Sequence, residues 1–340
     1  MYLDLLANPP LIASNHTQLL SRRSQNLPPI SQDLFKKNQR ELCALGEYFG
    51  LQGGENFSFL SGDFVELFVH LRDKKIGFAI SNHQQAYQAY KLTQNLCDFT
   101  PIIPDQESGI ISALPDCDVY ILPLINQDLL TLNPISQLKA NILNKNPNAI
   151  FVIDISYAVA RGEKLGFDPC LQTILLCDGE SLGFLRGYGI YLTTDQHFSL
   201  FPPTRYIDGL YSAILEEIQR RATPNKQDYK DQVFELLQKE LGDDMMLFAP
   251  LTSSLPNTLA LRLRHIKARS LLQSLFLEEI FAINGQECLF GFASPSFVLQ
   301  EMGYTQDQAR ELLSLSFDEF SPHVFKTLAS HYKNLRILEI

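Results

Sequence analysis

A continuous apolar run that ends in an acid, Ile150 to Asp154, constrains the fold of this chain more than any other feature of its sequence. Runs of this kind are typical of strands that are buried on both faces of a parallel sheet. Ligands collect at the carboxyl ends of such strands, so Asp154 is predicted to lie at a binding edge. A glycine-punctuated segment over 177–189 follows, and the residues of its turn at Glu180–Ser181 are expected to decide what that edge can bind.

The segments before and after this run alternate between strand-like and helix-like patterns. Strands are predicted at 57–60, 76–81, 97–105, 116–126, 150–154 and 189–192. Helices are predicted at 32–50, 65–71, 84–96, 134–144 and 206–221. Strands that alternate with helices at this spacing indicate an α/β fold with a mainly parallel sheet, covered by helices on both faces.

The remainder of the chain has a different organisation. After an acidic helix at 229–244, short strands and helices alternate up to a final helix that begins at Pro322. Thr305, followed by Gln308, predicts a capping box at a helix start. We therefore predict a large α/β domain over 12–221 and a smaller α+β domain made of 1–11 and 222–340.

Composition excludes several classes of protein. The net charge of −10 argues against nucleic-acid binding, which needs a basic surface. No apolar run approaches the ~20 residues of a membrane-spanning helix, and the first residues do not resemble a signal peptide. Six cysteines without CxxC or Cys/His metal spacing favour reduced thiols, no metal site and a cytoplasmic location. No P-loop, GxGxxG, HExxH or GxSxG motif occurs, so nucleotide-binding and hydrolase functions have no support.

Three polar side chains follow predicted strands directly: His83, Gln127 and Asp154. Each of them alone is more often incidental than functional. Because the carboxyl ends of parallel strands share one edge of a sheet, the three together suggest a pocket there.

Several segments, in order and spacing, resemble one family along essentially the whole chain. They are Tyr2–Asp4, 61–66, Asn82–His83, 125–128, 154–159, 254–259, 267–280, Cys288 and 294–310. In these segments the chain resembles the cysteine desulfurases, which belong to the class V aminotransferase group of enzymes that depend on pyridoxal phosphate (PLP). The resemblance implies the PLP-dependent transferase fold (fold type I), a small domain built from both chain ends, and a homodimer.

Three functional residues of that family have counterparts here. By resemblance, Asp154 stands where an aspartate pairs with the pyridinium nitrogen, and His83 where a histidine stacks on the ring. Cys288 stands where a cysteine attacks the sulfur of the substrate and becomes a persulfide. A buried aspartate, an incidental histidine and a spare thiol remain the alternatives.

Other family positions are changed. The Ser-x-His-Lys turn, which binds the phosphate and forms the Schiff base, corresponds to Asp178, Gly179, Glu180 and Ser181, and no lysine occurs from 165 to 225. Serine cannot form an imine. By the same resemblance, Phe64 stands at the position of the family's phosphate-turn threonine. Gln127 and Tyr157 stand at the two positions whose residues contact the pyridine hydroxyl in the family. Ser314 stands at the position of the arginine that binds the substrate carboxylate.

These departures predict that the fold is kept and that no cofactor is bound. Two functions follow: an interaction protein that pairs with an active desulfurase, an iron–sulfur scaffold or a sulfur acceptor, or a sulfur relay through Cys288. Glu287 beside Cys288 disfavours a reactive thiolate, which counts against the relay. The alternative is an active PLP-dependent cysteine desulfurase or class V aminotransferase.

Overall fold

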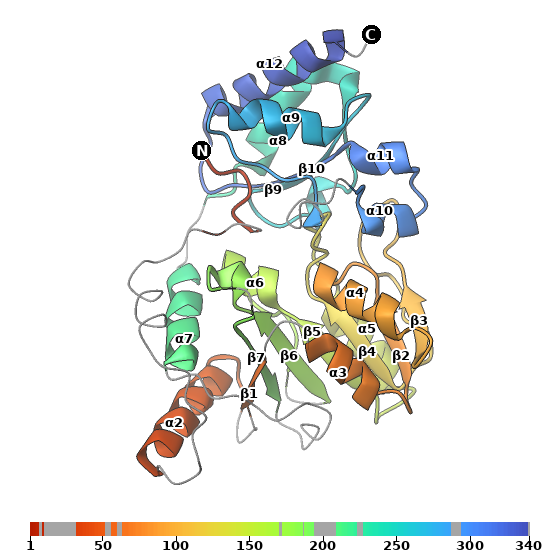
Figure 1. Cartoon of the computed structure of the whole chain (residues 1–340), viewed down its shortest axis with the longest axis vertical. Coiled ribbons are helices and arrows are strands. Elements are labelled where there is room, and N and C mark those ends of the chain that lie inside the picture. The colour runs from red at the N-terminus through yellow and green to blue at the C-terminus, as the bar shows by residue number, and fades with distance from the viewer. Residues whose placement is uncertain are drawn as a thin grey trace.

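The computed structural model describes residues 1–6, 9, 32–51, 56–59, 63–169, 172–185, 187–193, 209–222, 227–286 and 294–338. Figure 1 shows a lower part built on a large twisted sheet and an upper part that holds both chain ends. Because the predictions for Cys288 and for the start of the helix at 206–221 fall between these ranges, they lie outside the described residues.

The large sheet has the mainly parallel arrangement that the sequence predicts. Its order in the described residues is β1-β7-β6-β5-β4-β2-β3. The strands are β1 (Asn56–Phe59), β2 (Lys75–Ala79), β3 (Asp98–Ile102), β4 (Val119–Pro123), β5 (Ile150–Asp154), β6 (Thr173–Asp178) and β7 (Gly189–Thr193). All pairs from β3 through β6 are parallel, and only β7 and β1 run antiparallel to their neighbours. The carboxyl ends of β2, β4, β5 and β6 therefore meet at one edge.

Helices cover both faces of this sheet. They are α2 (Gln32–Tyr48), α3 (Asp63–His70), α4 (Gln84–Thr93), α5 (Ile135–Leu143), α6 (Ser156–Arg161) and α7 (Leu210–Arg221). Side chains that alternate along β5 enter two different cores: Phe151 and Ile153 pack with α2, α5, α6 and α7, whereas Ile150 and Val152 pack with α3 and α4. The continuous apolar run of β5 is thus explained by burial on both faces.

The upper part is built on a second sheet, which is antiparallel, and it has its own hydrophobic core. It contains α8 (Lys230–Leu241), β8 (Met245–Leu247), β9 (Thr258–Leu263), α9 (Ala268–Phe276), α10 (Phe297–Glu301), α11 (Gln306–Arg310), β10 (Leu312–Ser316) and α12 (Pro322–Leu338), with strand order β10-β9-β8. The first residues of the chain join it, since Leu3 N–H donates to Phe281 O at 2.7 Å and Asp4 pairs with Ser316. The domain boundaries at 11 and 222 remain a prediction.

Three element boundaries differ from the sequence-based expectation or refine it. Residues 173–178, which received no strand prediction, form β6, because a short apolar run has too few residues for its period to be read. In the segment 267–280, helix α9 ends at Phe276, and Glu279 takes a left-handed φ of 55° in the turn that follows. The capping box at Thr305 and Gln308 is confirmed, with both of its hydrogen bonds present.

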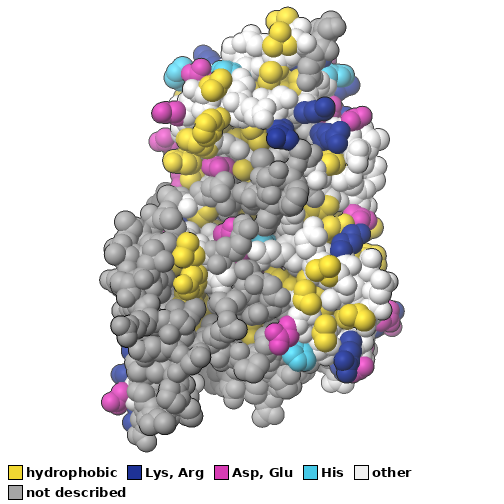
Figure 2. Space-filling view, viewed as in Figure 1, with side chains coloured by type: hydrophobic (Ala, Val, Ile, Leu, Met, Phe, Trp, Pro, Cys, Tyr) yellow, Lys and Arg dark blue, Asp and Glu magenta, His cyan; other side chains and the backbone are white. Residues whose placement is uncertain are grey.

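The surface in view carries charges of both signs. In Figure 2, both Lys or Arg and Asp or Glu side chains lie on the described parts of this face, and several of the basic side chains lie near one another at its upper right. None of the described helices has the length and apolar character needed to cross a membrane.

Candidate functional site

The residues predicted to form a pocket gather at the edge where β2, β4, β5 and β6 end. Asp154 and Asp178 are the last residues of the adjacent strands β5 and β6. His83 is the N-cap of α4, four residues after β2, and Gln127 lies in the loop after β4. The parallel topology brings them together although up to 95 positions separate them in the sequence.

Asp154 is buried and fully engaged in hydrogen bonds. Its Oδ1 accepts from the backbone N–H of Ser156 at 2.9 Å and from the Ser156 hydroxyl at 2.5 Å, and its Oδ2 accepts from Gln127 Nε2 at 3.2 Å. Burial raises the pKa of the Asp154 carboxyl, and neighbouring Asp178 raises it further, while the bonds from Ser156 and the proximity of His83 lower it. The net effect favours the protonated acid relative to an aspartate in water.

His83 links the helix start to the end of β6. Its Nδ1 accepts from the backbone N–H of Gln85 at 3.2 Å, and its Nε2 lies 3.8 Å from Asp178 Oδ2. The ring is therefore held on one side by the first turn of α4 and faces an acid on the other. This acid contact is one that the sequence did not predict.

The turn after β6 is held together by its own side chains. Asp178 Oδ1 accepts from the backbone N–H of Glu180 at 3.0 Å, and the Ser181 hydroxyl donates to the Asp178 carbonyl at 2.8 Å. A β-carbon at Gly179 would lie 2.5 Å from the Tyr188 carbonyl, so only glycine fits there. Ser181 is thus a short turn residue whose hydroxyl is already used.

Two other predicted positions, Tyr157 and Phe64, are buried. Tyr157, in the first turn of α6, is 6% exposed, and burial together with nearby carboxylates, Asp128 first among them, raises the pKa of its hydroxyl. Phe64, at the start of α3, is buried in the core beside Phe68, with ring centroids 6.3 Å apart. A phenylalanine there supplies no hydrogen-bond donor for a phosphate.

Ser314 lies on β10 and is joined to the loop after β4. Its hydroxyl donates to the Asp128 carbonyl at 2.7 Å. The Asp128 side chain, fully buried, accepts from the backbone N–H of Gln286 at 2.9 Å and from the Ser296 hydroxyl. Burial raises the pKa of the Asp128 carboxyl, and its hydrogen bonds oppose the shift.

Sequence reasoning singled out Ser314 but gave no role to Asp128, Gln286 or Ser296. The motif at 125–128 marked the loop, yet nothing in it indicates that the small sheet is bound there. Gln286 also accepts from Gln84 N–H at 2.7 Å through its Oε1 and donates to the Asn82 carbonyl at 3.2 Å. Two segments of the upper part are therefore fixed to this edge of the large sheet.

Thiol and metal chemistry have little support among the described residues. Cys288 lies outside them. Cys177, next to Asp178, is buried, and its pKa is raised well above the usual range by burial and by neighbouring acids. No group of three or more His, Cys, Asp and Glu side chains in the described part of the chain is placed to hold a metal ion.

Comparison with known proteins identifies the fold. No protein-family model matches the chain, and no curated protein matches its sequence. Among solved structures, a NifS-like protein from Rickettsia africae has a TM-score of 0.72 at 17% identity, with 99% of each chain covered. A cysteine desulfurase from Thermococcus onnurineus has a TM-score of 0.70 at 14% identity, covering 98% of this chain and 94% of that one. The histidinol-phosphate aminotransferase of Clostridium acetobutylicum has a TM-score of 0.65 at 14% identity, with 99% of each chain covered.

These similarities extend over the full length, so the chain has the fold of PLP-dependent aminotransferases. Within that class it has the class V aminotransferase-like, cysteine desulfurase-like form, as the resemblance in the sequence implied. At 12–17% identity the likeness concerns the fold alone.

Proposed function

We propose that this chain is a cysteine desulfurase-like protein that lacks PLP-dependent catalysis and acts by binding partner proteins in sulfur or iron–sulfur metabolism. The observation that carries the proposal is the turn after β6. A serine whose hydroxyl is bound to the Asp178 carbonyl stands where the resemblance places the Schiff-base lysine.

The residues at the sheet edge do not fit a covalently held PLP. Asp154 and His83 keep the chemical types that would contact the ring. Asp178 and Glu180, however, place two acids where a phosphate dianion would have to lie, and at about 5 Å each like charge costs about 1 kcal/mol or more. Phe64 adds no donor, and Ser314 cannot replace a bidentate guanidinium for a substrate carboxylate.

The direct test mixes purified protein with PLP. We expect no absorbance band near the visible edge and no adduct after borohydride reduction, read by intact-protein mass spectrometry. A stoichiometric wild-type adduct on any lysine at this edge would overturn the proposal and favour the active PLP enzyme.

A restored turn provides the positive control. The triple variant Asp178→Ser, Glu180→His, Ser181→Lys recreates the family turn, and we expect it to form the trappable adduct. Ser181→Lys alone keeps both acids and should bind PLP about tenfold more weakly than the triple variant. If the single and triple variants bind equally, electrostatic repulsion by the turn is not the obstacle.

Partner binding is the function proposed in place of catalysis. The well-kept small-domain segments support it, since in the family this domain carries partner and dimer surfaces. We propose a homodimer that pairs with an active desulfurase, an iron–sulfur scaffold or a sulfur acceptor protein in the cytoplasm. Affinity capture from native lysate should enrich such a component; recovery of none would contradict this function.

A sulfur relay is a second candidate, and the retained Cys288 favours it. In this reaction the Cys288 thiolate attacks the outer sulfur of a donor enzyme's cysteine persulfide, forms a new S–S bond and releases the donor thiolate. Incubation with a persulfidated donor followed by peptide mass spectrometry should show a gain of one sulfur on Cys288. The Cys288→Ser variant is the control, and transfer that persists in it would exclude the relay.

A further inference from the structure

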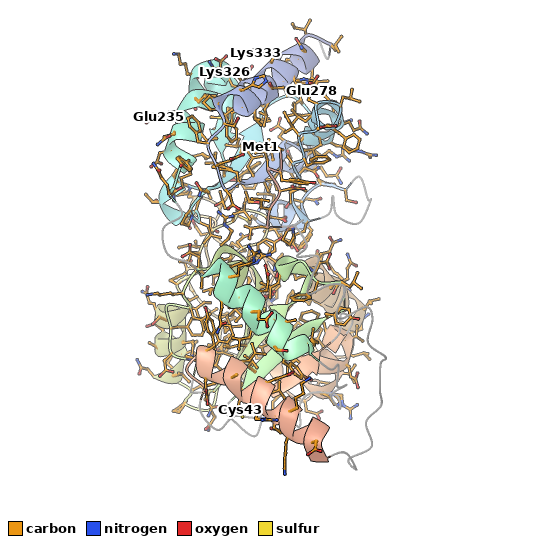
Figure 3. The ribbon with its side chains drawn as sticks, turned by 90° about the vertical axis from the view of Figure 1, so that its left-hand side faces the viewer. Met1, Cys43, Glu235, Glu278, Lys326 and Lys333 are labelled. Atoms are coloured by element: carbon orange, nitrogen blue, oxygen red, sulfur yellow. The ribbon has the colours of Figure 1, made fainter. Side chains whose placement is uncertain are left out.

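A concave site lies away from the sheet edge, where three helices end. It is a cavity of about 340 Å³, within the range of small-molecule sites. Tyr48 and Phe49 line it from the end of α2, Gly162 from the end of α6, and Ile218 and Ala222 from the end of α7. Figures 1 and 3 both show α2 and α7 side by side in the lower part of the molecule.

The walls of this cavity are mostly aromatic or aliphatic. Tyr48 and Phe49 meet edge to face with ring centroids 5.0 Å apart, and Phe167 faces the cavity from the loop after α6. Val159 and Leu165 complete the apolar lining. Aromatic faces carry negative potential and attract cations.

Glu163 is the acidic residue among those that line this apolar site. Glu163 is half-buried, and burial raises the pKa of its side chain. No hydrogen bond or ion pair of its carboxylate occurs among the described residues. The nearby cations are engaged elsewhere: Arg161 binds Asp318 at 3.0 Å, and Lys230 donates to the Ser254 carbonyl at 3.0 Å.

The backbone holds Glu163 in place. Its N–H donates to the Ala158 carbonyl at 2.9 Å. A β-carbon on the preceding Gly162 would lie 2.2 Å from the Arg221 carbonyl, so the loop is seated directly on the end of α7. The site is therefore preorganised, which lowers the cost of binding.

The end of α2 adds to the negative potential at this cavity. A helix C-terminus carries a partial negative charge that basic residues normally offset. The last turn of α2 contains no basic residue. The ends of α6 and α7 carry basic residues that are already bound: Arg161 to Asp318, and both Arg220 and Arg221 to Glu217. Arg221 also donates to the Ala160 carbonyl near the end of α6, so the uncompensated end is that of α2.

We propose that this cavity binds a small organic cation, an ammonium group attached to an apolar or aromatic body. The ammonium would pair with Glu163, and the apolar body would lie against Phe49 and Phe167. Lys164 also lines the cavity, but its side chain is exposed, so it lies toward solvent rather than among the apolar walls. An anion would be repelled by the negative charge of Glu163 before it reached the apolar walls. The site shares no residue with the sheet edge, and the proposal is independent of PLP binding.

Binding of 2-phenylethylamine, compared with its neutral isostere 2-phenylethanol, tests the proposal by calorimetry or by NMR titration. The amine is protonated at neutral pH and should bind about tenfold more tightly than the alcohol. Glu163→Gln should weaken amine binding by about tenfold and leave alcohol binding unchanged. Glu216→Gln removes an acid of α7 outside the cavity and should behave as wild type.

Thermal denaturation of each variant ensures that the folded proteins are compared. Tyr48→Leu, which removes an aromatic wall at the partly exposed rim, should weaken the amine severalfold while Glu163 is intact. The proposal is overturned if the wild type does not bind the amine, if it binds amine and alcohol equally, or if the preference survives in Glu163→Gln.

Discussion

At the scale of single residues, the sheet edge contains two buried acids, Asp154 and Asp128, whose side-chain oxygens accept hydrogen bonds from neutral donors. Asp154 and Asp128 both have raised pKa values, because burial penalises their charged forms more than their hydrogen bonds stabilise them. Asp154 in particular is contacted by donors that a neutral amide could also satisfy. Its charge is therefore a cost to folding that a neutral residue would avoid.

The first prediction concerns Asp154→Asn. The oxygen of the substituted side chain would accept both bonds from Ser156, and its amide nitrogen would donate to Gln127 once the Gln127 amide has flipped. That flip keeps one hydrogen bond between the two side chains, so the expected gain comes from removing the buried charge of Asp154. We expect the free energy of unfolding at pH 7 to rise by about 1 kcal/mol.

The sign of the pH dependence follows from the raised pKa. The pKa of an aspartate in the unfolded chain is about 3.9, and that of Asp154 in the folded protein is higher. Such a carboxyl contributes its full stabilisation when the pH is below the unfolded-state pKa. This contribution is lost as the pH rises through the folded-state pKa. Urea denaturation from pH 4 to 7.5 should therefore show the variant's advantage growing with pH. Asp116→Asn, at an exposed acid, should show no such growth; a constant difference for Asp154→Asn would refute the explanation.

At the scale of elements, the turn after β6 depends on α7 for support. Glu217 and Arg221 form a buried pair at 2.6 Å, and the Arg221 guanidinium donates to the carbonyls of Ala160 and Leu182. The Ala160 carbonyl lies in the last turn of α6. The Leu182 carbonyl lies at the end of the short 3-10 helix Glu180–Leu182, which contains Ser181. One arginine thus fixes the position of two elements that form the candidate site.

The second prediction compares neighbouring arginines of α7. Arg221→Met leaves Glu217 without its buried partner and removes two carbonyl contacts, so it should lower the free energy of unfolding by about 3 kcal/mol. Arg220 also binds Glu217, at 2.5 Å, but its side chain is 52% exposed. Arg220→Met should cost about 0.5 kcal/mol. Urea denaturation measures both, and equal losses would contradict this account.

At the scale of the whole molecule, Asp128 joins the two sheets. Its carboxylate and carbonyl accept from Gln286, Ser296 and Ser314, which all belong to the upper part of the molecule. Aromatic packing adds to the junction, since Tyr87 of α4 stacks on Phe297 of α10 with ring centroids 4.1 Å apart. The upper part is therefore held against the edge that carries the candidate site.

The third prediction is that Asp128→Ala weakens this junction. It leaves buried donors at Gln286 and Ser296 without an acceptor, which should cost about 3 kcal/mol. Hydrogen exchange followed by mass spectrometry should show faster exchange first in residues 281–286 and 294–301. Asp118→Ala, which removes an exposed acceptor of the Lys75 N–H, should cost less than about 1 kcal/mol. Slow exchange in both segments of Asp128→Ala would contradict the assigned role.

The sequence by itself determined the fold class, the order of most elements and the edge at which Asp154, His83 and Gln127 meet. It could do so because apolar period and turn residues are local, and because a parallel sheet places strand ends together whatever the loops contain. The tertiary structure alone decided that β6 pairs beside β5, that Asp178 faces His83, and that Asp128 and Arg221 hold distant segments. It also decided that three helix ends and Glu163 line one cavity. These contacts join residues far apart in the chain, and their energies depend on burial and geometry, which no local pattern records.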